Sequence, residues 1–98
     1  LSITKLLDYF SKNEEVDIVA HNDELNSILF GEVKWSRKQV GTDIYQNLKK
    51  KAQKVTWGRK GRNEHFCLFS KTGFTNAMVK IAKKECVFLF TEDILKRS

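Results

Sequence analysis

Two strand-like segments joined by a short polar stretch constrain the fold of this chain more than any other feature of its sequence. Residues 15–20 are β-branched and alternate in the manner of a half-buried strand, and residues 28–35 form a second segment of the same kind. The residues between them are mostly polar and include Asn22-Asp23, a common turn signal. A connection this short predicts a β-hairpin with antiparallel strands.

Two segments with helical periodicity follow, each ahead of an apolar segment typical of a strand. The first covers residues 44–55 with Thr42 as the expected N-cap, and the second covers residues 76–84 with Thr75 as N-cap and Ala77 facing inward. Residues 65–69 and 86–90 are the expected strands, and residues 1–11 fit a helix or a strand, of which we favour a strand. Because helical crossovers join parallel strands, the expected fold class is α/β, with a mixed sheet flanked by helices.

The length and the charge of the chain narrow the classes of partner. Its 98 residues suit one small domain, residues 1–98. Residues 1–40 carry five basic and seven acidic side chains, whereas residues 41–98 carry 13 basic and five acidic ones. The cationic second half predicts nucleic-acid binding, although a solvated basic surface is the alternative. The candidate nucleic-acid-binding residues are Lys49, Lys50, Arg59, Lys60, Arg62 and Lys71.

Signals for export, membrane insertion and zinc binding are missing from the sequence. No apolar run approaches the roughly 18 residues of a membrane span, and no secretory leader is visible, so we expect a cytoplasmic protein without a membrane partner. Cys67 and Cys86 fall in expected strands and are interpreted as core residues.

Trp35 is interpreted as a packing residue, and Trp57 either packs over a helix end or stacks on a base. The chain begins with Leu1, and we expect it to be a fragment of a longer protein.

Acidic and basic side chains meet at the end of the expected hairpin. Alternation places Glu32 and Lys34 on one face of their strand, and a hairpin can bring Asp17 beside Glu32. Two carboxylates, with the carbonyl oxygen of Val33 as a third ligand, suit Mg²⁺ or Mn²⁺. Lys34 could then orient or deprotonate a water molecule, or stabilise negative charge on a phosphate, and Gln46 could bind water or phosphate. The alternatives are a solvated strand face with a Glu32–Lys34 ion pair, and a helix-surface glutamine.

A resemblance to a known family supports the predicted metal site. Glu15-Val-Asp17-Ile-Val-Ala and Ile28-Leu-Phe-Gly-Glu32-Val-Lys34-Trp35-Ser36 resemble the PD-(D/E)XK nuclease superfamily pattern. More narrowly, with residues 48–52, 68–75, 88–90 and 92–94, the chain is similar over roughly residues 9–95 to the C-terminal domain of archaeal and bacterial AAA-type ATPases. The resemblance implies a restriction-endonuclease-like fold, a divalent-metal site at Asp17, Glu32 and Lys34, and an upstream ATPase domain. It makes Glu15 an auxiliary ligand or only a neighbour. The chain itself has no phosphate-binding G-x-x-x-x-G-K-[ST] loop.

Two hypotheses about function follow from these features. The first is a metal-dependent phosphodiesterase that acts on DNA as an endonuclease or exonuclease, with Asp17 and Glu32 as ligands and Lys34 beside the nucleophilic water. The second is a catalytically inactive DNA-binding or protein-interaction module of an AAA-type ATPase. A purely structural or dimerisation domain would bind neither metal nor DNA.

Overall fold

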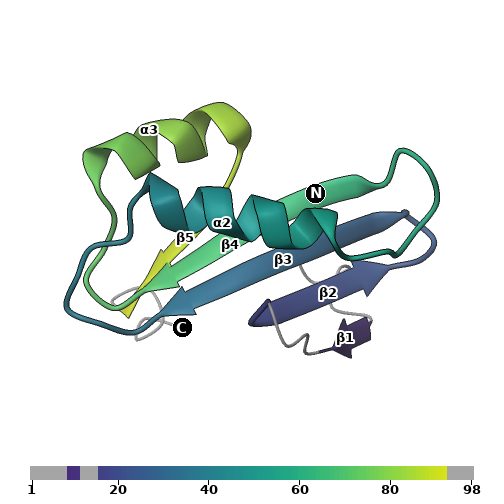
Figure 1. The fold of residues 1–98 in the computed structure, drawn as a ribbon, viewed down its shortest axis with the longest axis horizontal. Coiled ribbons are helices and arrows are strands. Elements are labelled where there is room, and N and C mark those ends of the chain that lie inside the picture. Colours follow the sequence, from purple (N-terminus) through teal and green to yellow (C-terminus); the bar gives the residue numbers. More distant parts are fainter. Residues whose placement is uncertain (1–8, 12–15, 93–98) are drawn as a thin grey trace.

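The strands of the sheet follow one another in the same order as in the sequence. The computed structural model describes residues 9–11 and 16–92, which form a five-stranded sheet and two helices (Figure 1). β1, β2 and β3 pair antiparallel, whereas β4 and β5 pair parallel, each to the strand before it. The predicted α/β class, with a mixed sheet and helical crossovers, is therefore confirmed. The elements are β1 (Tyr9–Ser11), β2 (Ile18–Asn22), β3 (Ser27–Lys34), α2 (Thr42–Gln53), β4 (Asn63–Ser70), α3 (Asn76–Glu85) and β5 (Phe88–Thr91).

The hairpin of β2 and β3 has a register that fixes which residues face each other. Ile18 pairs with Gly31, and Asn22 pairs with Ser27 at the other end of the hairpin. The turn between them covers residues 23–26, where the Leu25 amide donates to the Asn22 side chain and Asn26 takes a left-handed backbone conformation. β2 begins three residues later than the sequence predicts, so Asp17 lies just before the strand. Of the predicted N-terminal strand, residues 9–11 are confirmed, and residues 1–8 lie outside the described part.

Both helices cover the same face of the sheet (Figure 1). The main core lies between them and the sheet, with Phe30 and Leu68 from the strands packed against Leu48 and Met78 from the helices. A smaller apolar cluster on the other face contains Cys67, which burial keeps protonated by raising the pKa of its thiol to about 12. Cys67 is thus the core residue that the sequence predicts.

The N-cap of α3 agrees with the sequence prediction, whereas the N-cap of α2 and the environments of Ala77 and Cys86 differ from it. Thr75 is the N-cap of α3 as predicted, and its hydroxyl accepts a hydrogen bond from the Met78 amide. The N-cap of α2, however, is Gly41 and not Thr42. Ala77 is exposed, and Cys86 is the exposed left-handed C-cap of α3, which places it before β5. Among the described residues, no helix has both the length and the apolar composition to cross a membrane.

Candidate metal centre

The antiparallel register brings two carboxyl groups together at the end of the hairpin. Because Ile18 pairs with Gly31, the next pair outward is Asp17 and Glu32. Asp17 Oδ2 accepts a hydrogen bond of 2.9 Å from the backbone amide of Val33, which anchors Asp17 against β3 although it precedes β2. The two side chains are close enough for Glu32 to influence the pKa of the Asp17 carboxyl group. The structure thus brings together the two acidic residues that the sequence singles out.

Glu32 is a buried acid with one oxygen atom left without a donor. It shares its strand face with Ile28 and Phe30, and only 5% of its surface is exposed. Glu32 Oε1 accepts a hydrogen bond of 3.0 Å from Lys51 Nζ, whereas Oε2 is buried without a hydrogen-bond partner among the described residues. When both acids are ionised, Asp17 cannot supply that partner, because neither carboxylate carries a proton. An unpaired buried acceptor is costly, and a cation would relieve that cost.

Asp17 is held in its charged form. Burial would raise the pKa of its carboxyl group, but the Val33 amide, the hydrogen bond with Glu32 and the positive charges of Lys51 and Lys34 together lower the pKa below its ordinary value. Asp17 is therefore ionised at neutral pH. A carboxylate in this state is ready to bind a cation without first losing a proton.

Two lysines complete the cluster, and only one of them is predicted from the sequence. Lys34 lies two residues after Glu32 on the same strand face and is exposed. Lys51 comes from α2, where it lies next to the buried Leu48, three residues earlier, on the helix surface. In the sequence it is one of three consecutive lysines, Lys49 to Lys51, and nothing separates it from its neighbours. Its helical offset from Leu48 and Ala52 is the signal that could have identified it.

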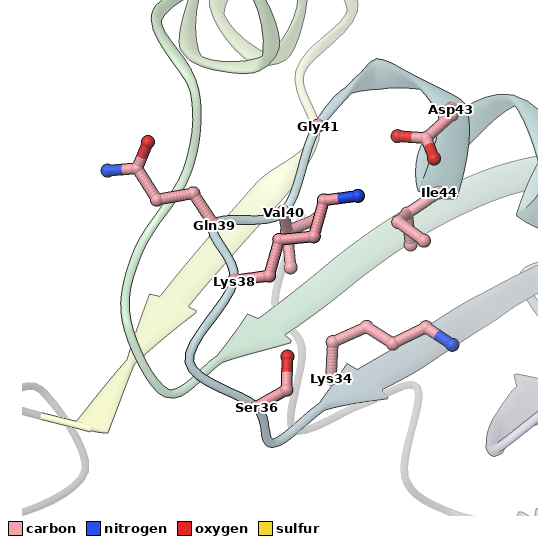
Figure 2. A pocket seen from close by; sticks show the side chains of 8 residues that line it. All are labelled: Lys34, Ser36, Lys38, Gln39, Val40, Gly41, Asp43 and Ile44. Carbon is pink, nitrogen blue, oxygen red and sulfur yellow. The ribbon is translucent and has the colours of Figure 1, made fainter.

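A shallow pocket of about 130 Å³ lies between the end of β3 and the start of α2. Figure 2 shows the Lys34 and Lys38 side chains extending to the same side of the connecting segment, with Ser36 and Asp43 also on the pocket wall. Since about 10–15 Å³ on this measure is enough for one water molecule, the pocket has room for a group the size of a phosphate. Lys34 lines this pocket, and its charge also acts on Asp17.

The roles predicted for three further residues, Gln46, Glu15 and Val33, stay predictions. Gln46 is exposed, and five residues at 100° each turn it about 140° around α2 from Lys51, so it does not point towards the carboxylates. Glu15 lies outside the described residues. The amide of Val33 is used by Asp17, and the role of its carbonyl oxygen stays a prediction. In the described part of the chain, no group of three or more His, Cys, Asp or Glu side chains could hold a metal ion.

The Arg62 side chain caps the C-terminal end of α2. Its guanidinium donates hydrogen bonds of 2.7–3.1 Å to the carbonyl oxygen atoms of Val55, Trp57 and Ala52. It also forms an ion pair with Glu64 at 2.8 Å. These bonds satisfy carbonyl groups at and beyond the C-terminal end of α2. Arg62 therefore has a structural role at the end of α2, and its predicted contact with nucleic acid stays a prediction.

The other predicted nucleic-acid-binding residues differ in their exposure and in whether their charged groups contact other residues. Lys49 is half-buried, forms an ion pair with Glu85 at 3.3 Å and lies over the Tyr45 ring. Arg59 is exposed, with only a long contact of 3.5 Å from its guanidinium to the Asp23 carbonyl oxygen. The side chains of the remaining three are exposed and have no ion pair among the described residues: Lys50, Lys60 and Lys71.

The two tryptophans have different environments. Trp57 packs against the core, with its ring centroid 4.5 Å from that of His21, and packing is the first of its two predicted roles. Trp35 is 50% exposed, contrary to its predicted packing role. Trp35 follows the last residue of β3, and neither of the two described helices packs against it.

Replacing Arg62 tests its role at the end of α2. We expect Arg62→Lys to lower the free energy of unfolding by about 1.5–3 kcal/mol, because a lysine cannot reach three carbonyl groups at once. Urea denaturation followed by circular dichroism measures the change. Arg59→Lys, in the same loop, is the matched control and should stay within about 0.5 kcal/mol of wild type. Equal stability of the two variants would contradict the capping role.

Comparison with known proteins finds one family. The sequence model of DUF234, described as archaeal and bacterial proteins of unknown function, matches residues 1–55. This match covers more than half of the chain and includes Asp17, Glu32, Lys34 and Lys51. Neither a curated protein nor a solved structure matches the chain.

Proposed function

This chain belongs to the DUF234 family of archaeal and bacterial proteins of unknown function, and we propose that it is a magnesium- or manganese-dependent phosphodiesterase that acts on DNA. The observation that carries this proposal is the Asp17–Glu32 pair, in which Glu32 Oε2 is buried without a donor. The resemblance of the same residues to the PD-(D/E)XK nuclease pattern supports it. The upstream AAA-type ATPase domain that this resemblance implies is part of the proposal.

The donor set fits a small, hard cation. Mg²⁺ is commonly held by one or two carboxylates, and water molecules and substrate phosphates complete its shell. Asp17 and Glu32 would supply the carboxylates, and the carbonyl oxygen of Val33 is the candidate third ligand. When bound, such an ion supplies an acidified water molecule and polarises a phosphoryl oxygen.

The chain's own residues would bind and orient the DNA. Lys34 lines the pocket and its charge acts on Asp17, so its ammonium group would orient the attacking water or stabilise charge on the phosphate. Lys38 and Ser36 would hold a phosphate group in the pocket. The exposed Lys50, Arg59, Lys60 and Lys71 would attract the DNA backbone by counterion release.

A specific contact favours a second candidate function. Lys51 already pairs with Glu32, so the buried carboxylate is partly neutralised by the protein itself. A centre of this kind also suits a catalytically inactive module that binds DNA or docks on a protein within an AAA-type ATPase. In that case DNA binding would weaken as salt is raised but would not need a metal ion.

One experiment separates the two functions. Supercoiled plasmid is incubated with the purified chain and Mn²⁺, Mg²⁺ or EDTA, and DNA binding is measured in parallel at several salt concentrations. Nicking or degradation with Mn²⁺ or Mg²⁺, and none in EDTA, supports the phosphodiesterase. Salt-dependent binding without any cleavage supports the inactive DNA-binding module. The absence of both binding and cleavage contradicts the phosphodiesterase and the DNA-binding module, and leaves only docking on a protein.

A further inference from the structure

We infer that Lys51 is a built-in counter-cation of the Asp17–Glu32 pair, and that a divalent metal ion must displace it from Glu32 in order to bind. This inference rests on the proposed metal centre and adds a residue to it. The contact that carries it is the hydrogen bond of 3.0 Å from Lys51 Nζ to Glu32 Oε1. The charge of Lys51 also acts on Asp17, so one ammonium group serves both acids.

The burial of the partners shows which group can move. The Glu32 side chain is only 7% exposed, whereas the Lys51 side chain is 34% exposed and has an open path to solvent. Leu48 and Ala52, next to Lys51 on the helix surface, are buried and hold α2 on the sheet. The four-carbon stem of a lysine is flexible, so the ammonium group can leave while the helix stays in place.

The charges show why it must leave. The ammonium groups of Lys51 and Lys34 balance the two carboxylates, and the cluster is neutral when all four groups are charged. A divalent ion on Glu32 Oε2 would share one carboxylate group with the ammonium group of Lys51, which lies 3.0 Å from Oε1. Two cations this close repel strongly in a partly buried site. The metal ion and Lys51 therefore compete for Glu32, and Lys51 is free to contact a phosphate once it is displaced.

Metal titration of a neutral variant tests the competition. Lys51→Gln removes the charge but keeps an amide donor for Glu32 Oε1, and Lys50→Gln is the matched control at an adjacent exposed lysine. Mn²⁺ is titrated into each protein by calorimetry. We expect Lys51→Gln to bind Mn²⁺ about 10-fold more tightly than wild type, and Lys50→Gln to bind like wild type.

Thermal unfolding is the second readout, because it also reports whether each variant folds. Mn²⁺ should raise the melting temperature of Lys51→Gln more than that of wild type, since the ion fills the place of the missing ammonium group. Equal or weaker Mn²⁺ binding by folded Lys51→Gln would overturn the inference and leave the metal centre standing. Absence of Mn²⁺ binding in all three proteins would overturn the metal centre and the competition together. Should Lys51→Gln fail to fold alone, Mn²⁺ must restore its unfolding transition, or the inference is wrong.

Discussion

Asp17→Asn is expected to reduce metal-dependent DNA cleavage by at least about 100-fold, since loss of even an outer-shell partner of a metal costs 10–100-fold. The substitution removes one of the two negative charges of the centre while keeping an oxygen that can accept the hydrogen bond from the Val33 amide. Asp17 is exposed and precedes β2, so the fold should be preserved. The measurement is the initial rate of plasmid nicking with Mn²⁺, together with the heat of Mn²⁺ binding.

Asp23→Asn provides the matched control for this prediction. It makes the same chemical change at an acidic residue in the hairpin turn, at the opposite end of β2. Its side chain is 80% exposed, so the change should leave cleavage within a factor of two or so of wild type. Equal cleavage by wild type and Asp17→Asn would remove Asp17 from the proposed site. A loss in both variants would point to overall charge and not to a metal ligand.

Phe30→Ala is expected to lower the free energy of unfolding by about 3–5 kcal/mol, the usual cost of truncating a fully buried aromatic residue. Phe30 has no exposed surface and lies at the centre of β3, between the sheet and α2. Its ring stacks on Phe66 with centroids 5.7 Å apart, and the Arg62 guanidinium lies 5.6 Å from its centroid. A small domain has little stability to spare, so this variant should be largely unfolded at moderate temperature.

Equilibrium denaturation in urea measures this loss. Leu25→Ala is the control, because Leu25 is 44% exposed in the hairpin turn and should change stability by no more than about 0.5 kcal/mol. A loss below about 1 kcal/mol in Phe30→Ala would contradict the packing of the main core. Far-ultraviolet circular dichroism of both variants shows whether the secondary structure is retained in the absence of urea.

Much of the fold could be predicted because helical and strand periodicities are local. The spacing of Leu48 and Ala52 predicts α2, and the alternation of Ile28, Phe30 and Glu32 predicts that these three side chains share one face of β3. The errors lie at element ends. Cys86 was expected in a strand but caps α3, because its left-handed backbone ends the helix before β5 begins. Such a cap depends on one backbone angle, which an apolar side chain does not reveal.

The candidate site could be predicted only where it lies within one hairpin. Alternation and antiparallel pairing are enough to place Asp17 beside Glu32, since Asp17 directly precedes β2 and Glu32 lies in the neighbouring strand β3 of the same hairpin. Gln46 was expected in the site because it lies on the helix that follows Lys34, yet it faces away. Lys51 was not expected there, because the rotation of a helix about its axis is not visible in a run of lysines.

The sequence by itself determined the order and type of the elements, the strand face that carries Glu32, and the pairing that brings Asp17 to it. Only the tertiary structure decided that Lys51 reaches Glu32 Oε1, that Glu32 Oε2 is left without a donor, and that Arg62 holds the end of α2. The physical reason is the range of the interactions. Periodicity and hairpin pairing act over a few residues along the chain. The rotation of α2 about its axis is set by the packing of Leu48 and Ala52 against the sheet. That rotation decides that Lys51, and not a neighbouring lysine, contacts the buried Glu32.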